Sequence, residues 1–90
     1  MDLKEAREEI NRIDTEMAGL FIRRMEAARD IAAYKRAHGL PVEDRQQEQR
    51  VIDAHAKLIG DETLRPYYIR FLQNTMDVSK LWQHRLLSDD

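Results

Sequence analysis

Apolar side chains recur every seven residues along the first 38 residues of the chain. One row follows positions 3, 10, 17, 24 and 31, and a second row lies three positions further on. This heptad spacing predicts a long α-helix with an apolar seam. Asp2 can cap its start and Gly39 can end it, so we expect the helix to cover residues 3–38. The two rows contain Leu3, Ile10, Met17, Arg24 and Ile31, and then Ala6, Ile13, Leu20, Ala27 and Tyr34.

Two short stretches, residues 39–41 and 60–66, hold both prolines and two of the three glycines, and they divide the chain into three segments. After the first stretch, Asp44 has the position of a helix cap and Gln47 that of its capping-box partner. We therefore expect a short second helix that runs from this cap to Gly60.

The third segment also has helical spacing. It follows Thr63, and Pro66 falls in its first turn, where proline is tolerated. We expect residues 88–90 to form a frayed tail. The sequence thus predicts an all-α fold with three helices per chain, long, short and long, in a single domain covering residues 1–90. One side of the third helix carries Leu64, Tyr68, Phe71, Leu72, Thr75, Met76, Ser79, Trp82 and Leu86.

The length of the first helix predicts the assembly. A helix over residues 3–38 is about 54 Å long, whereas a compact chain of this size has a diameter of about 30 Å. One chain cannot cover such a helix, and a two-fold pair would cover both exposed seams. The alternative is a break near Gly19 that gives a monomeric bundle. Glycine costs only about 1 kcal/mol inside a helix, so we favour an intertwined homodimer.

Composition narrows the function classes. The 90 residues carry a formal charge of −2 with both signs interspersed, which gives no basic field for nucleic acid. No apolar run approaches the ~20 residues that span a bilayer, and the first residues lack a signal-peptide pattern. The chain has no cysteine, and its histidines lack metal-ligand spacing. We expect a cytoplasmic protein with no metal, cofactor, nucleic-acid or membrane partner.

Two cations interrupt the apolar seam of the first helix. Arg24 stands in the apolar row, and Lys35 lies eleven residues later, about 20° round the same face. An unpaired buried charge costs several kcal/mol, so an acidic side chain or an anionic ligand must compensate each cation. Spacing alone favours an ion pair, for example with Asp14 or Glu48. Arg7 lies about 100° away from Arg24 and roughly 25 Å along the helix, too far to serve the same pocket easily.

Polar residues also continue the apolar stripe of the third helix. Ser79 and Gln83 are spaced i, i+4 after Leu72 and Met76. Taken alone, they are more typical of a boundary than of a site. Glu48 opens the second helix, where the helix dipole favours a carboxylate whatever its function.

The order of these residues resembles the all-helical, type II chorismate mutase family. The resemblance covers nearly the whole chain, and its spacings are specific only when taken together: seventeen residues between the arginines, eleven to the lysine, thirteen to the glutamate, and four between serine and glutamine. With this resemblance, an anionic ligand becomes the favoured partner of the two seam cations. The matching residues are Ala6-Arg7-Glu8-Glu9-Ile10, Asp14, Arg23-Arg24, Ala33-Tyr34-Lys35, Pro41-Val42-Glu43-Asp44, Glu48, Ser79 and Gln83.

The resemblance implies the Claisen rearrangement of chorismate to prephenate in phenylalanine and tyrosine synthesis. This substrate is a dianion that rearranges within one molecule, so the enzyme needs no nucleophile, metal or proton transfer. By resemblance, Arg24 and the Arg7 of a partner chain clamp the two carboxylates. Lys35 and Gln83 donate to the ether oxygen as its C–O bond breaks.

The resemblance assigns the remaining substrate-binding positions to the second and third helices. Glu48 accepts a hydrogen bond from the substrate hydroxyl, the backbone of Asp44 assists, and Ser79 helps to hold a carboxylate. Gln47 is a departure, since most of the family has an arginine immediately before the glutamate. The absence of this arginine's charge weakens the positive field of the site unless Arg50, three residues further along, replaces the charge.

Two other functions remain open on the sequence. An isochorismate pyruvate lyase of the same fold has a similar clamp of arginines and lysine, but we expect such lyases to lack the clear pattern of residues 42–44 followed by Glu48. A non-catalytic helical regulatory or interaction module is a different class. Such a module needs no cations inside its seam. Of the three, the mutase is favoured.

Overall fold

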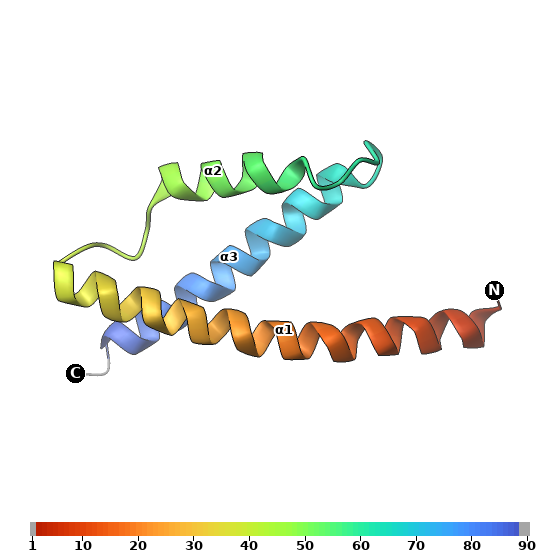
Figure 1. Cartoon of the computed structure of the whole chain (residues 1–90), viewed down its shortest axis with the longest axis horizontal. Coiled ribbons are helices and arrows are strands. Elements are labelled where there is room, and N and C mark those ends of the chain that lie inside the picture. The colour runs from red at the N-terminus through yellow and green to blue at the C-terminus, as the bar shows by residue number, and fades with distance from the viewer. Residues whose placement is uncertain (1, 89–90) are drawn as a thin grey trace.

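The computed structural model describes residues 2–88 and contains three helices in the predicted order, long, short and long. They are α1 (Leu3–His38), α2 (Arg45–Ala56) and α3 (Arg65–Ser88). No strand occurs among the described residues. Figure 1 shows α1 and α2 at different levels, with α3 running from the end of α2 down to α1. The predicted all-α class is confirmed for the single chain.

Helix α1 begins and ends where its capping residues predict. The carboxylate of Asp2 accepts a hydrogen bond from the backbone N–H of Glu5 at 2.8 Å. At the other end, Gly39 adopts φ 64°, the left-handed conformation that glycine takes without steric cost. The helix continues through Gly19, so the alternative of a break there is wrong.

Helix α2 is shorter than predicted. Asp44 caps it by accepting from the N–H of Gln47 at 3.1 Å. The expected return bond of a capping box is missing, because the side-chain oxygen of Gln47 accepts from Arg50 instead. The helix ends at Ala56 and not at Gly60. After Ala56 the backbone forms a tighter turn, in which the N–H of Leu58 donates a hydrogen bond to the carbonyl of His55, three residues earlier, at 2.9 Å.

Helix α3 is longer than predicted at its C-terminal end. Pro66 lies in its first turn, as expected. Ser88 still belongs to the helix, where its hydroxyl donates to the carbonyl of Arg85 at 3.0 Å, so the expected tail does not begin there. Residues 89–90 of that expected tail lie outside the described residues.

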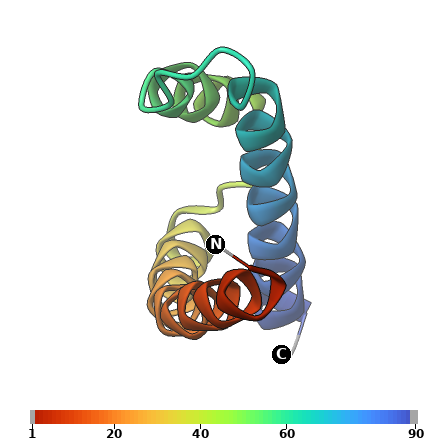
Figure 2. The same cartoon turned by 90° about the vertical axis from the view of Figure 1, so that its right-hand side faces the viewer.

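The C-terminal halves of α1 and α3 pack closely against each other (Figures 1 and 2). Ala28 and Ala32 of α1 are only 2% exposed, and their small side chains let the helices approach. The indole N–H of Trp82 donates to the carbonyl of Met25 at 3.2 Å. This contact fixes the position of α3 along α1. Among the described residues, the buried apolar ones are Ala28, Ala32, Val42, Leu72 and Met76.

The N-terminal half of α1 extends beyond α2 and α3 (Figure 1). The longest dimension of the chain is 52 Å, close to the length expected for this helix alone. Large apolar side chains of the seam are exposed there, including Leu3 at 65% and Leu20 at 57%. Within residues 2–88, no helix is long and apolar enough to cross a membrane.

We predict that Ala28→Leu lowers the free energy of unfolding by about 1–3 kcal/mol, because the added atoms must push α3 away from α1. Urea unfolding followed by circular dichroism measures this loss. Ala54→Leu, on an exposed face of α2, is the matched control and should stay within about 0.5 kcal/mol of wild type. Equal effects of the two changes would contradict the close contact.

Candidate active site

A cavity of about 250 Å³ is bordered by all three helices and by the loop before α2. It brings together seven of the eight predicted site residues. The remaining one, Arg7, is absent from its lining. The cavity is lined by Arg24, Ile31 and Lys35 from α1, by Val42 and Asp44 from the loop, by Gln47, Glu48 and Val51 from α2, and by Met76, Ser79, Lys80 and Gln83 from α3.

The two seam cations line this cavity without an acidic partner. The ammonium of Lys35 donates to the backbone carbonyl of Val42 at 2.7 Å. Among residues 2–88, no carboxylate lies within ion-pair distance of Lys35 or of Arg24. The ion pair with Asp14 or Glu48 that spacing alone favoured is therefore wrong. Two positive charges face a cavity that an anion can enter.

Glu48 forms an ion pair with a residue that the sequence analysis did not select. Its Oε1 lies 2.8 Å from the ammonium of Lys80, and both side chains are about one quarter exposed. The hydrogen bond to Glu48 raises the pKa of Lys80 above its ordinary value, so Lys80 is charged near neutrality. The other oxygen of Glu48, Oε2, is buried and has no hydrogen-bond partner within residues 2–88.

Ser79 and Gln83 are buried, and not boundary residues as their spacing suggests. They are 8% and 6% exposed, and the Nε2 of Gln83 donates to the hydroxyl of Ser79 at 3.4 Å, a long hydrogen bond. The Oε1 of Gln83 has no partner among the described residues. Buried polar atoms without partners are costly, and they are frequently satisfied by a ligand or water.

The loop before α2 is fixed to both neighbouring helices. Lys35 of α1 binds the carbonyl of Val42, and His84 of α3 lies 2.7 Å from the carboxylate of Glu43. The hydrogen bond with His84 holds the pKa of Glu43 below its ordinary value. These two contacts place Asp44 at the edge of the cavity. Its carboxylate caps α2, so its backbone is the part left to meet a ligand.

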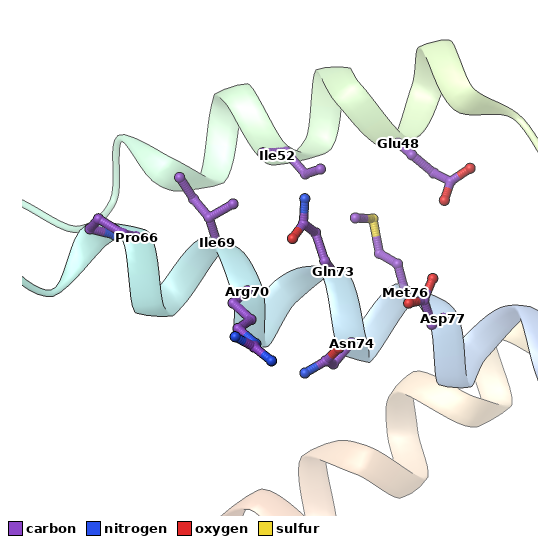
Figure 3. Close-up of a pocket in the computed structure, with 9 residues that line it drawn as sticks. All are labelled: Glu48, Ile52, Pro66, Ile69, Arg70, Gln73, Asn74, Met76 and Asp77. Atoms are coloured by element: carbon purple, nitrogen blue, oxygen red, sulfur yellow. The ribbon is translucent and has the colours of Figure 1, made fainter.

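A larger cavity of about 570 Å³ lies between α2 and α3 and shares Glu48 and Met76 with the first (Figure 3). Among residues 2–88, Arg70 is its only lining cation, and Figure 3 shows this side chain pointing away from α2. The smaller cavity has three lining cations and is therefore the better site for an anion. Arg50 lines neither cavity, which argues against it as the replacement for an arginine at position 47.

Arg7 lies seventeen residues before Arg24 on α1, roughly 25 Å away along the helix. It borders a separate surface hollow near the start of α1. Within one chain the structure therefore does not bring Arg7 to the other site residues. Within residues 2–88, no cluster of three or more His, Cys, Asp or Glu side chains could hold a metal ion.

The arrangement can bind an anion that carries a hydroxyl group. Three cations and the amide of Gln83 supply donors, while the free oxygen of Glu48 supplies an acceptor. In a partly desolvated cavity, such fixed donors stabilise negative charge more strongly than water does. Chemistry that develops charge within a bound anion fits this site.

A model of a known protein family matches most of the chain. The family model described as chorismate mutase type II matches residues 6–84, which include every predicted site residue. No solved structure matches the chain.

We predict that Glu43→Gln lowers the unfolding temperature near pH 6 by weakening the contact that holds the loop to His84. Because the folded-state pKa of Glu43 lies below its ordinary value of 4.5, its contribution is present above that value and is lost as pH falls through the folded-state pKa. The difference between variant and wild type should therefore shrink near pH 3 in thermal unfolding. Glu62→Gln is the control, and a difference independent of pH would contradict the charged contact.

Proposed function

The chain belongs to the chorismate mutase type II family, and on that premise we propose that it converts chorismate to prephenate as an isomerase. One observation carries the proposal: within residues 2–88, Arg24 and Lys35 face a cavity without acidic partners, beside side-chain oxygens of Glu48 and Gln83 that have no hydrogen-bond partner. A dianion with a hydroxyl group complements both kinds of group. Chorismate has this chemistry.

The reaction needs positioning and charge stabilisation more than chemical participation. In a Claisen rearrangement, a C–O bond breaks while a C–C bond forms within the same molecule, and negative charge grows on the ether oxygen. Arg24 binds one carboxylate and helps to hold the compact conformer. Lys35 and Gln83 donate to the ether oxygen, where their contribution is largest in the transition state.

The ligand-free contacts of these donors support this role. Lys35 binds the carbonyl of Val42, so its ammonium is already held at the cavity and can use its other hydrogens for a ligand. The 3.4 Å bond between Gln83 and Ser79 is weak, so the amide can give it up at little cost. Ser79 then binds a substrate carboxylate.

The acceptor side of the site lies at the start of α2. The free oxygen of Glu48 accepts from the substrate hydroxyl, and the backbone of Asp44 assists it. Gln47 lines the same end of the cavity as a neutral group. The hydrogen bonds of the substrate hydroxyl thereby set the orientation of the substrate relative to Arg24 and Lys35.

We propose that the functional unit is a homodimer. The exposed apolar seam of α1 needs a cover of matching length, and a second copy of the same helix provides one. Among the described residues that line the cavity, Arg24 is the only arginine, and it binds the first carboxylate. In the dimer, the Arg7 of a partner supplies the guanidinium for the second carboxylate. We place this activity in the cytoplasm, within aromatic amino-acid synthesis.

The first test is conversion of chorismate, followed by loss of its absorbance and by identification of prephenate. Lys35→Ala should lower kcat by at least about 100-fold, the scale found when one preorganised donor is lost. Lys57→Ala, outside the cavity, is the matched control and should keep wild-type kcat. Release of pyruvate from isochorismate, without prephenate formation, would instead identify a lyase, and near-normal kcat in Lys35→Ala would exclude its donor role.

The second test concerns the shared site. Arg7→Ala and Arg24→Ala should each be nearly inactive, because each removes one carboxylate clamp from both sites of a dimer. After co-refolding of equal amounts, about half of the dimers are mixed, and each mixed dimer has one intact site of two. About a quarter of wild-type activity should return by this symmetry argument.

The control for this test is each variant refolded alone, which should regain nothing. Native mass spectrometry of differently labelled chains shows whether mixed dimers have formed. Activity equal to the mean of the two variants, in a sample that contains mixed dimers, would show that Arg7 does not serve the partner's site.

A further inference from the structure

We propose that Lys80 is a positioning residue of this site: its ammonium holds one oxygen of Glu48 so that the other can accept the ligand's hydroxyl, and its charge makes the cavity attractive to a dianion. The proposal rests on the proposed function for the identity of the ligand. The positioning of Glu48 by Lys80 is argued from the contact between α2 and α3 alone.

The contact has the geometry that a positioning role requires. Glu48 lies in the first turn of α2 and Lys80 in the second half of α3, and their 2.8 Å ion pair joins the two helices beside the cavity. The ammonium of Lys80 binds Oε1 of Glu48, whereas Oε2 is buried and has no hydrogen-bond partner among the described residues. One bound oxygen fixes the carboxylate, and the free oxygen remains for a ligand.

The charges that line the cavity show why this lysine matters for binding. Arg24, Lys35 and Lys80 are cationic, whereas Asp44 and Glu48 are anionic. The lining therefore has one excess positive charge, and without Lys80 the two signs would balance. Without Lys80, the partner's Arg7 would be the only excess positive charge of the proposed site, and the uncompensated carboxylate of Glu48 would repel a dianion.

No other cation can take this place in the described chain. Arg50 donates to the side chain of Gln47 and does not border the cavity. Within residues 2–88, Lys80 is the only cation within ion-pair distance of Glu48. Asp77 lies 3.5 Å from Lys80 but is largely exposed, so it is the weaker partner.

Steady-state kinetics with chorismate test the role of Lys80 in the reaction. Lys80→Met removes the charge but keeps much of the side-chain length, and it should lower kcat/KM by at least about 10-fold, the scale of a hydrogen bond between charged groups. Lys80→Arg should recover most of the loss. Lys57→Met makes the same change in net charge at a residue outside the cavity, and its kcat/KM should match that of wild type. Wild-type kcat/KM in Lys80→Met, or an equal loss of kcat/KM in Lys57→Met, would overturn the proposal.

A double substitution separates positioning from general stability. Glu48→Gln removes the charge that Lys80 holds, so adding Lys80→Met to Glu48→Gln should cost far less than Lys80→Met alone. Urea unfolding of all variants shows whether each remains folded. Losses that multiply independently would show that Lys80 does not act through Glu48.

Titration of Lys80 in the ligand-free protein keeps this proposal distinct from the proposed function. The hydrogen bond to Glu48 raises the pKa of Lys80, so Glu48→Gln should lower that pKa toward its ordinary value of 10.5, as followed by nitrogen NMR of the ammonium. Asp77→Asn should change it less. If wild type does not convert chorismate, the proposed function fails, and this titration still decides whether Glu48 and Lys80 are paired. An unchanged Lys80 titration in Glu48→Gln would overturn the pairing.

Discussion

The close approach of α1 and α3 at Ala28 and Ala32 is the contact on which the site depends. Both alanines are almost fully buried, so the helix axes can approach until Trp82 reaches the backbone of α1. This places the polar end of the α3 stripe opposite Arg24 and Lys35. Larger residues at the two positions would separate the donors of α3 from the cations of α1.

Several polar groups of the candidate site lower the stability of the folded chain. Arg24 and Lys35 have no acidic partner in the described chain, and the side chains of Glu48 and Gln83 each keep a buried oxygen without a hydrogen bond. A core built only for stability would fill these positions with apolar groups. In the proposed function, an anion with a hydroxyl group lowers this cost when it binds, and part of the free energy lost in folding is recovered as affinity and orientation.

Local signals in the sequence predicted the elements well, because capping and turn residues act through their immediate neighbours. Asp2, Gly39 and Asp44 bound their helices as expected. The end of α2 was missed because it closes through i+3 backbone bonds at Leu58, where no helix-breaking residue stands. Lys80 was missed because its role depends on where α2 lies, although it follows Met76 by four residues on the same face of α3. Spacing could align Arg24 with Lys35, but only the fold could show that neither meets a carboxylate.

Helix α1 links the chemistry of the proposed enzyme to its assembly. Its C-terminal half forms a wall of the cavity, while its N-terminal half exposes an apolar seam that one chain leaves uncovered. The two arginines of the proposed clamp lie on these different halves, too far apart for one straight helix to bring both to one cavity. In the proposed dimer, burial of the seam and completion of the clamp are therefore the same event. A monomer would keep Lys35, Glu48 and Gln83 in place but would lack the second arginine of the proposed clamp. In the proposed dimer, the apolar seam therefore affects substrate orientation as well as stability.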